Sequence, residues 1–592
     1  MNTHYWLISA TCMVLMTSMV QTATSTVTTQ QVTYTRIQTS TKDLPKDKAF
    51  VASMLTERIG ERTQLQRRGK TLKVSFRIDP SLEEDEAVID ISKGRAVVRG
   101  GRFRTVVAGT GQLLRALRYQ EHSVVLRDGR QTYHPANHFR QAYLSRHFDN
   151  FFHRAPAKDI LRYIDDLALW GINGIHTMLQ YPEVDADHAT PADLDSFKTT
   201  SDQIVEHVHA LDLILTVTGG SNTAPSDMPK EYHANKNIPR RGADEYNVCP
   251  EKPGALDYLL SLRKEAVQKF ADKKIDGFVY WPYDEGGCTC EECRPWGGKG
   301  YVKLIEKYRN IHEEYYPHCT HLVSTWFFDD DDWKLFYDYL FRQDWIDYLI
   351  VDAHNDFPRF PLEHPIPKNI KIITFPEISM WGRRPWGGFG AIAMPERFER
   401  LFRQAQPVAC GFQLYSEGIF EDLNKIVVNG LYTTPASHAD DILKEYAHYE
   451  FPGCDTEDFK EFIRLLEATH WTRQAPNTHH SYVVNYLKNT SDEELAARAR
   501  LADKALVLAE KIDKSILPSM RKSWRWRIFK LRAVIDHEIF NNRNLYTPAA
   551  IEAYRELVRI YHAEEQQRGL AKGYGGHTCP PLLPEYKREP QN

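Results

Sequence analysis

The pair of adjacent carboxylates Asp284-Glu285 follows a short apolar run, Gly277–Tyr280, in the segment IDGFVYWPYDEGG. An apolar run of this length that begins at a glycine predicts a buried strand. Neighbouring side chains at the tip of a strand point in different directions, so the two carboxyl groups can occupy different environments. Burial and mutual repulsion would raise the pKa of one of them and keep it protonated for donation to a leaving group. The pair is therefore a candidate for general acid catalysis.

Further acids and aromatic residues follow other apolar runs of the same kind. Glu377 is a second candidate for a catalytic group. The candidates for substrate binding are Arg140, Trp326, Asp352, Trp381, Tyr415 and Glu417. One protonated carboxyl group near a second carboxylate is the arrangement that cleaves glycosidic bonds, and aromatic faces in loops suit the apolar faces of sugar rings. These residue types together predict glycoside hydrolysis.

Three cysteines follow the carboxylate pair closely, as Cys288, Cys290 and Cys293 in the pattern C-x-C-x-x-C. With a fourth ligand this cluster could hold a structural zinc ion. The alternatives are a local disulfide together with a partner such as Cys249, which suits an exported protein, or free thiols. We expect a structural role by metal or disulfide, and no cofactor that the reaction requires.

The elements that position these residues repeat as a strand followed by a helix. Eight such units run from residue 138 to residue 436, and their strands begin near Gln141, Ile172, Leu213, Asp276, His321, Ile346, Lys371 and Cys410. Eight units of this size are typical of a (β/α)8 barrel, in which the carboxyl ends of the strands carry the active site. The repeat places Asp284-Glu285 at the fourth strand and Glu377 at the seventh, on opposite sides of the barrel. The acidic run that begins at Asp329 is expected to cap the fifth helix.

Two further domains flank the predicted barrel. Residues 33–135 alternate strand and helix and predict a small α+β domain, with a first strand near residues 32–39 and a hairpin that turns at Lys93-Gly94. Residues 437–571 show helical periodicity alone and predict a helical domain, whose last helix is expected at residues 549–567. Residues 572–592 are rich in glycine and proline and predict an extended tail. The expected fold class is α/β, a TIM barrel with an N-terminal α+β domain and a C-terminal helical domain.

The N-terminus of the chain indicates where the protein is located, and its net charge indicates which partners it could bind. Residues 1–23 contain an uncharged apolar run from Tyr5 to Val20 with small residues near Ala23, which predicts a signal peptide and export to the periplasm or the medium. No later run is long and apolar enough for a membrane span. The formal net charge is −4, from 75 basic and 79 acidic residues, which favours no nucleic-acid partner. The expected partner is an oligosaccharide or another glycan.

The segment HFRQAYLSRHFDN at strand one and the Asp-Glu pair that closes strand four resemble the family 20 β-N-acetylhexosaminidases and the α-glucuronidases. The resemblance covers the architecture from about residue 33 to residue 436. It implies that Glu285 is the general acid and that Asp284 orients the acetamido group of the substrate, which attacks the anomeric carbon. It also implies that Arg140 binds ring hydroxyls and that Trp326, Trp381 and Tyr415 wall the pocket. Ser145 stands where the hexosaminidases carry an aspartate, and the cysteine cluster is not part of their pattern, so the chain looks like a distant relative.

The function predicted first is an exported, exo-acting glycoside hydrolase that cleaves N-acetylhexosamine-containing glycans by a retaining, substrate-assisted mechanism. A second mechanism uses Glu377 as nucleophile or base, which removes the need for an acetamido group and suits uronic-acid or neutral sugars. Two other classes stay open, a carbohydrate-binding barrel without activity and a metal-assisted hydrolase or lyase that uses Asp352, His354 and the cysteine cluster.

Overall fold

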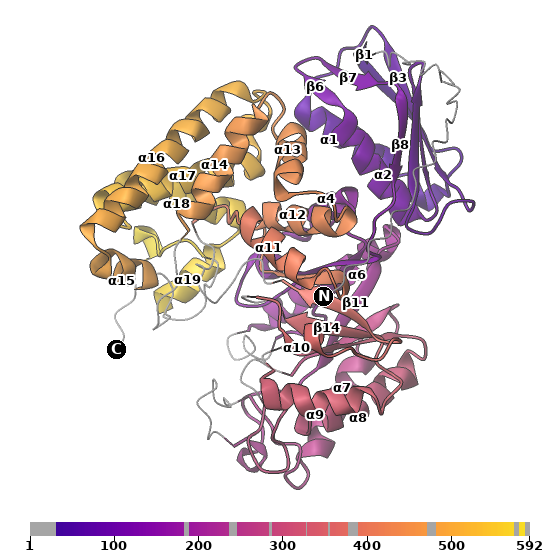
Figure 1. The fold of residues 1–592 in the computed structure, drawn as a ribbon, viewed down its shortest axis with the longest axis vertical. Helices are drawn as coiled ribbons and strands as arrows, with labels where there is room; N and C mark the ends of the chain where they lie inside the picture. Colours follow the sequence, from indigo (N-terminus) through magenta and orange to yellow (C-terminus); the bar gives the residue numbers. More distant parts are fainter. Residues whose placement is uncertain are drawn as a thin grey trace, which may run out of the picture.

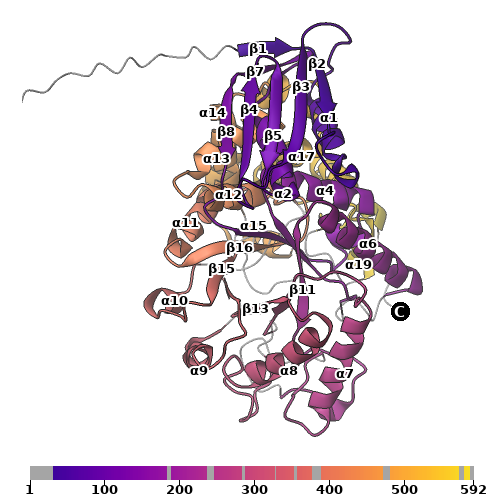
Figure 2. The same ribbon diagram turned by 90° about the vertical axis from the view of Figure 1, so that its right-hand side faces the viewer.

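A closed barrel of eight strands forms the lower part of the molecule in Figure 1, with an N-terminal part built on β-sheets at the upper right and a C-terminal group of helices at the upper left; Figure 2 shows the same arrangement from the side. The computed structural model describes residues 31–182, 189–235, 246–282, 287–326, 328–352, 356–376, 389–470, 481–572 and 579–586. The fold class predicted from the sequence is confirmed.

The barrel is parallel throughout and closes in the order β10-β11-β12-β13-β14-β15-β16-β9. Its strands are β9 (Phe139–Leu144), β10 (Gly174–Thr177), β11 (Ile214–Gly220), β12 (Gly277–Tyr280), β13 (Thr320–Ser324), β14 (Tyr348–Asp352), β15 (Lys371–Phe375) and β16 (Ala409–Ser416). The last strand pairs with the first over six residues, from Gly411 beside Phe139 to Ser416 beside Leu144. Because all strands run in the same direction, their carboxyl ends meet at one end of the barrel.

Helices follow the strands as the repeat predicts. They are α3 (Phe151–Arg154), α4 (Ala157–Trp170), α6 (Pro191–Ala210), α7 (Ala255–Gln268), α8 (Gly300–Tyr315), α9 (Asp330–Leu340), α10 (Phe360–Glu363), α11 (Pro395–Ala405) and α12 (Asp422–Thr433). The helix α4 ends at Gly171, whose φ of 101° is the left-handed conformation that glycine adopts at helix ends. The predicted cap of the fifth helix is present, since the Asp329 carboxylate accepts bonds from the backbone N–H groups of Asp331 and Asp332.

The N-terminal part contains two sheets. Its strands are β1 (Gln31–Tyr34), β2 (Arg36–Ser40), β3 (Thr71–Ile78), β4 (Ala87–Ser92), β5 (Arg95–Gly100), β6 (Arg118–Gln120), β7 (Ser123–Arg127) and β8 (Gly129–Tyr133), and its helices are α1 (Val51–Arg62) and α2 (Phe103–Ala116). One sheet has the order β2-β3-β5-β4-β8 and the other the order β1-β7-β6. The hairpin at Lys93-Gly94 is confirmed. The single strand expected near residues 32–39 is instead divided between the two sheets.

Helices alone make up the C-terminal part. They are α13 (Ala439–Glu450), α14 (Thr456–Ala468), α15 (Ser481–Asn489), α16 (Asp492–Ser515), α17 (Trp524–Asn542), α18 (Pro548–Tyr561) and α19 (Glu564–Lys572). The last predicted helix is two helices, because His562 takes a left-handed conformation with a φ of 55° between α18 and α19. Short 3-10 turns lie at Lys46–Lys48, Lys230–Tyr232, Met520–Lys522 and Pro584–Tyr586.

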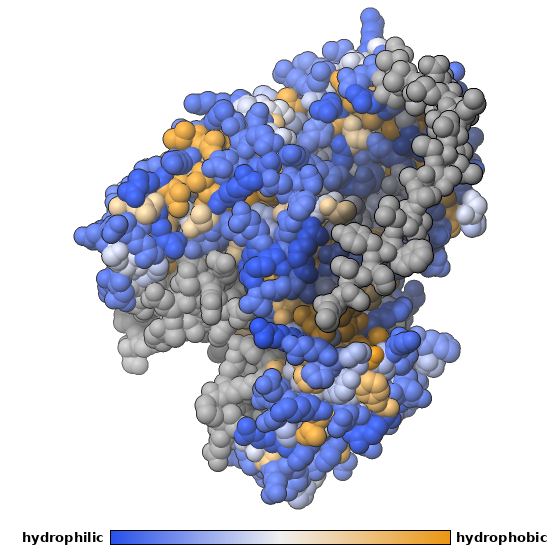
Figure 3. All heavy atoms as spheres, viewed as in Figure 1, coloured by the Kyte–Doolittle hydropathy of each residue, from blue (hydrophilic) through white to orange (hydrophobic). Residues whose placement is uncertain are grey.

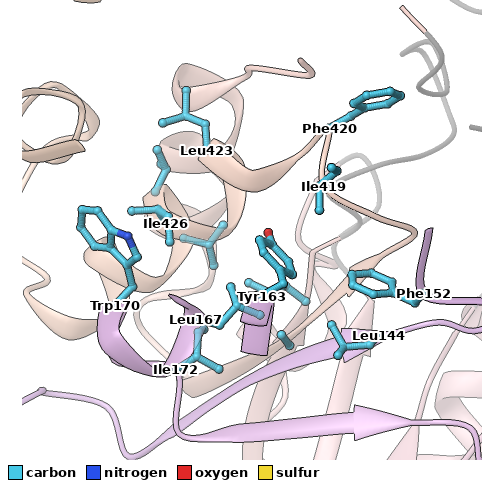
Figure 4. Close-up of a cluster of buried hydrophobic side chains, with 14 of the residues drawn as sticks. Leu144, Phe152, Tyr163, Leu167, Trp170, Ile172, Ile419, Phe420, Leu423 and Ile426 are labelled. Carbon is cyan, nitrogen blue, oxygen red and sulfur yellow. The ribbon is translucent and has the colours of Figure 1, made fainter. Parts of the chain in front are cut away.

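The helices α4 and α12 join the barrel to the rest of the protein. Figure 4 shows Tyr163 and Leu167 of α4 facing the start of α12, where Leu423 and Ile426 lie. The Tyr163 hydroxyl also donates to the Asp422 carboxylate at 2.9 Å. The face of the molecule in Figure 3 is mainly hydrophilic, with scattered apolar areas. Among the helices of the described residues, none has the length and apolar character to cross a membrane.

Candidate functional site

Aromatic side chains gather inside the barrel near the carboxyl ends of its strands. We call Tyr143, Trp281, Trp326, Phe375 and Tyr415 the aromatic cluster. The Trp281 and Trp326 rings stack with centroids 6.0 Å apart and an interplanar angle of 29°. Phe375 meets both edge-on, at 4.8 Å from Trp281 and 5.4 Å from Trp326. Below this layer lie the aliphatic side chains of Val279, Leu322, Ile350 and Ile373.

The alternation of strand residues explains why these rings share one surface. Successive residues of a barrel strand point alternately into the barrel and out toward the helices. Tyr143 of β9 and Tyr415 of β16 are partners in the strand register, and their rings meet edge-on with centroids 5.3 Å apart. Trp326 and Tyr415 were predicted to line one pocket, and the structure brings both into the aromatic cluster.

Glu417 lies beside the aromatic cluster, just after β16. The Tyr415 hydroxyl donates to Glu417 Oε1 at 2.9 Å and lies 2.7 Å from His147 Nε2. A phenol has one proton, so the bond to Glu417 leaves the Tyr415 oxygen to accept from a neutral His147 that carries its proton on Nε2. Tyr415 at the end of β16, with His147 and Glu417 just after β9 and β16, therefore forms one chain of polar groups at the barrel mouth. The sequence had suggested Tyr415 and Glu417 only as separate residues.

Burial keeps the imidazoles of this region neutral. It lowers the pKa of His147 to about 3. It does the same for His176 on β10, whose ring meets Tyr143 edge-on at 4.3 Å. Burial, with the nearby Glu417 carboxylate as the next cause, raises the pKa of Tyr415 well above its ordinary value. At neutral pH these groups act as hydrogen-bonding partners and not as charged groups.

The backbone that carries Glu417 is held by a second buried acid, Glu421. The Glu421 carboxylate accepts from the Ser416 hydroxyl and from the backbone N–H groups of Glu417 and Gly418, each at 2.9 Å. The Lys425 ammonium donates to the Gly418 carbonyl at 2.7 Å, and burial lowers the pKa of this lysine to about 8. Sequence reasoning missed Glu421. Its position four residues after Glu417, in the segment SEGIFED, is the only signal that could have pointed to it.

Asp352 is another predicted site residue that the structure places at the barrel mouth. Asp352 ends β14, is half-buried, and shares the inward face of that strand with Tyr348 and Ile350. Its register partner is Phe375 of the aromatic cluster. Asp352 therefore stands at the same end of the barrel as Glu417. Four other predicted residues lie outside the described part of the chain, namely Asp284, Glu285, Glu377 and Trp381, and so does His354 of the metal-assisted alternative.

Both described flanks of residues 283–286 contact one residue, Trp296. The Trp296 indole donates to the Pro282 carbonyl at 2.8 Å. On the other side Gly287 has a φ of 70°, and a Cβ at this position would lie 2.1 Å from the Trp296 ring. The chain thus enters and leaves this segment next to the same indole.

Arg140 is a correction to the predicted site. Its side chain points out of the barrel, because β9 directs Phe139 and Tyr143 inward and Arg140 lies on the opposite face between them. The guanidinium donates to the Gly171 carbonyl at 3.0 Å and also to the Asn137 carbonyl. Both acceptors precede a strand, at the amino end of the barrel, so Arg140 stabilises the structure there and does not bind a ligand at the mouth.

A cavity of about 130 Å³ adjoins the aromatic cluster on the side of β10 and β11. Tyr143 and Trp281 line it together with residues that follow these two strands, among them Gln180 and Ser221. The aromatic cluster therefore borders open space at the carboxyl end of the barrel.

The cysteine cluster lies on the side of β12. The sulfur atoms of Cys249, Cys288, Cys290 and Cys293 all lie within 4.8 Å of one another. The sequence named three of them as a group and Cys249 only as one conceivable partner. These are the residues of the described chain that could together hold a metal ion through cysteine, histidine or acidic side chains.

Comparison with solved structures shows that most of the chain, between 89% and 94% of it, shares its fold with several glycoside hydrolases. A family 115 4-O-methyl-α-glucuronidase with specificity for decorated arabinogalactans is similar with a TM-score of 0.60 and 10% identity, over 94% of this chain and 80% of that chain. The family 89 enzyme from Clostridium perfringens, in complex with GlcNAc-α-1,4-galactose, has a TM-score of 0.56 and 12% identity over 89% of this chain and 66% of its own. A family 138 enzyme that targets pectin rhamnogalacturonan II has a TM-score of 0.52 and 11% identity over 89% of this chain and 74% of its own.

No family model and no curated protein sequence matches the chain. The similarity is therefore one of fold at low identity, and it confirms the distant resemblance to glycoside hydrolases of the α-glucuronidase type that the sequence suggested.

Proposed function

We propose that this protein is a glycoside hydrolase that acts on a glycan at the carboxyl end of its barrel. One observation carries the proposal. A surface of stacked aromatic rings stands beside the buried carboxylate of Glu417, and both lie at the end of the barrel where enzymes of this fold carry their active sites. Sugar rings have apolar faces that suit aromatic surfaces and hydroxyl groups that suit carboxylates.

The described residues would supply binding and orientation. Trp281 and Trp326 offer ring faces for a sugar, and the position of each is supported by edge-on contact with Phe375. Glu417 would accept hydrogen bonds from sugar hydroxyls, with Tyr415 fixing one of its oxygens. The pKa of His147 lies far below neutrality, so this part of the site would bring no positive charge to the substrate.

For the chemical step we propose Glu285 as the general acid and Asp284 as the residue that orients an acetamido group. Glu285 would donate its proton to the glycosidic oxygen as the bond from that oxygen to the anomeric carbon breaks, while the acetamido oxygen of the substrate attacks this carbon. Water, deprotonated by the ionised Glu285, would then open the resulting ring and return the proton to Glu285. Because the attacking group is an acetamido oxygen, the substrate would be an N-acetylhexosamine-containing glycan, and the reaction would retain the anomeric configuration. The enzyme would remove sugars from the end of this glycan. The described residues on either side of this pair, Pro282 and Gly287, both contact Trp296 in the connection that follows β12, and this supports the assignment of the pair to the carboxyl end of that strand.

A second candidate is hydrolysis of uronic-acid or neutral sugars with Glu377 as nucleophile or base. One observation favours keeping it. The structure with a TM-score of 0.60 is that of an α-glucuronidase, and its fold covers 94% of this chain. In this version Glu285 keeps its role and the acetamido group is not needed.

A panel of aryl glycosides tests the proposal. The panel holds N-acetylhexosaminides, uronides and neutral glycosides in both anomeric forms, and it is assayed with the wild type, Glu285→Gln and Glu377→Gln. Turnover of an N-acetylhexosaminide that survives Glu377→Gln and is lost in Glu285→Gln is the expected result. Turnover confined to sugars without an acetamido group would contradict the acetamido mechanism and support the mechanism with Glu377 as nucleophile or base. Binding of glycans without any turnover would make the protein a carbohydrate-binding barrel.

We also propose export to the periplasm or the medium after removal of residues 1–23, and domain boundaries near residues 135 and 437. The apolar run from Tyr5 to Val20 supports the first part. Sequencing the N-terminus of the protein recovered from a native host checks the cleavage, and limited proteolysis checks the boundaries. An N-terminus at Met1 in a cytoplasmic fraction would contradict export.

A further inference from the structure

The four cysteines beside the candidate site have the spacing of metal-bound thiolates. The sulfur of Cys249 lies 3.8 Å from that of Cys290 and 3.9 Å from that of Cys293. Four sulfur ligands at about 2.3 Å from a zinc ion, at the corners of a tetrahedron, stand about 3.8 Å apart. A disulfide needs about 2.05 Å between its sulfurs. The distances therefore fit a tetrahedral metal site and not a pair of disulfides.

We propose that Cys249, Cys288, Cys290 and Cys293 bind a structural zinc ion. Four thiolates in a tetrahedral arrangement select zinc or iron, and zinc requires no redox partner. Because the chain itself supplies all four ligands, no coordination position is left open for water or substrate, so the ion would have a structural role. The sequence could suggest a metal at the C-x-C-x-x-C motif, and the structure supplies the fourth ligand.

The surrounding backbone holds the ligands in place. Cys249 follows Val248, whose N–H donates to the Asn222 carbonyl at 2.8 Å and whose carbonyl accepts from the Asn222 side-chain amide at 2.9 Å. The N–H of Cys249 itself donates to the Tyr232 carbonyl at 2.9 Å. On the other side the N–H groups of Cys293 and Arg294 both donate to the Cys290 carbonyl. Three of the four cysteines are buried, and Cys290 is half-buried. A site that is formed before the metal arrives binds it at a lower cost in conformational entropy.

The zinc ion would join two connections at the carboxyl end of the barrel. Cys249 belongs to the connection between β11 and α7, and the other three cysteines belong to the connection between β12 and α8. The helices α7 and α8 lie side by side (Figures 1 and 2). Gly300, the first residue of α8, has no room for a side chain, since a Cβ there would lie 2.4 Å from the Trp296 ring and 3.1 Å from Cys293 Cβ. The cysteine cluster and Trp296 thus form one packed unit.

This unit bears on the candidate acids, a consequence that rests on the proposed function. Cys288 is the third residue after Glu285 in the chain, and Trp296 contacts both flanks of residues 283–286. A metal that fixes Cys288 and Cys293 would therefore also fix Gly287 and Trp296, the described residues that follow the candidate acids in the chain. The cysteines would act as positioning residues and would not touch the substrate.

Metal analysis of the full-length protein, purified without chelating resins, tests the site. We expect one zinc ion per chain in the wild type and in the control variant Cys454→Ser, whose thiol lies outside the cluster. We expect none in Cys249→Ser and in Cys293→Ser. With the wild type alone, a mercurial reagent should release the zinc to a colorimetric indicator as about four thiols react, which keeps the test valid where a variant does not fold.

Three results would overturn the proposal, namely a wild type that holds no tightly bound metal, one that holds iron in place of zinc, or mass spectrometry that finds Cys249 in a disulfide. The zinc content is measured without reference to activity. A protein that binds zinc and cleaves no glycoside would support the metal site and contradict the proposed function. A protein that cleaves a glycoside and holds no zinc would support the proposed function and contradict the metal site.

Discussion

The two sides of the barrel mouth are held by different means. On the side of β16 and β9, Glu417 is surrounded by hydrogen bonds, and its carbonyl even accepts from Tyr561 of the distant helix α18 at 2.7 Å. On the side of β12, the described chain is held by the cysteine cluster and by the indole of Trp296, both within the connections that follow β11 and β12.

The difference shows how one barrel can combine a rigid binding side with a separately supported chemical side. Many buried hydrogen bonds from several helices make the position of Glu417 a property of the whole fold. The β12 side depends on one local unit. Damage to that unit should therefore leave the other side intact, and the predictions below test this separation.

The largest effect is expected from Glu285→Gln on the β12 side. Loss of general acid catalysis should lower kcat by about 10²–10⁴-fold on a substrate with a poor leaving group. A dinitrophenyl glycoside, whose leaving group needs no proton, serves as the matched control and should lose far less. Steady-state kinetics on both substrates gives the answer, and equal losses would argue against an acid role for this residue.

Removal of zinc should come next, and its effect should be confined to the β12 side. Structural metal ions contribute directly to the stability of the segments that they join. After chelation, hydrogen exchange measured by mass spectrometry should become at least about tenfold faster in residues 287–300 and stay unchanged in residues 415–425. Faster exchange in both regions would show that the two sides are not independent.

The variant Tyr415→Phe tests the β16 side. It removes the hydroxyl that donates to Glu417 and lies within hydrogen-bond distance of His147. Loss of a hydrogen bond to a charged group costs about 1.5–3 kcal/mol, so kcat/KM should fall by about tenfold to a hundredfold. Tyr337→Phe, which removes an exposed hydroxyl bonded to the Pro365 carbonyl, is the control. An unchanged kcat/KM in Tyr415→Phe would exclude this chain of groups from substrate binding.

Low pH should decrease the stability of the protein through His147, which lies on the β16 side. Burial lowers the pKa of its ring from an ordinary value of 6.5 to about 3. Between these values the unfolded chain takes up a proton that the folded chain does not, so the free energy of unfolding should decrease as the pH falls from about 6.5 toward 3. Urea unfolding at pH 7 and pH 5 measures the decrease, which should be smaller in His147→Gln. The same pH dependence in wild type and variant would refute the assignment.

The smallest effect on activity is expected from Arg140→Lys. Its guanidinium bonds to carbonyl groups at the amino end of the barrel, away from both sides of the mouth. KM should stay within about twofold of the wild type, while the free energy of unfolding should fall by about 1–3 kcal/mol because the lysine cannot reproduce the bonds. A tenfold rise in KM without loss of stability would restore the predicted role in binding.

Local patterns predicted much of the fold. The eight strand–helix units of the barrel and the hairpin at Lys93-Gly94 follow from hydrophobic periodicity and from turn-forming residues. The strand expected near residues 32–39 was wrong as a single element, because its two halves pair with different sheets. Of the candidate site, Trp326, Tyr415 and Glu417 were predicted at one end of the barrel and are found together there, whereas Arg140 was predicted on the wrong face.

The sequence by itself determined that eight strands alternate with helices and that acids and aromatic residues stand at the strand ends, because these patterns depend only on the local geometry of strands and helices. Only the tertiary structure decided which of these residues meet. It brings Tyr415 to His147, places Glu421 beneath Glu417, and joins Cys249 to Cys290, 41 residues later in the chain. Such contacts depend on which face of each strand points inward when the barrel closes and on how its connections pack. The spacing of neighbouring residues determines neither of these.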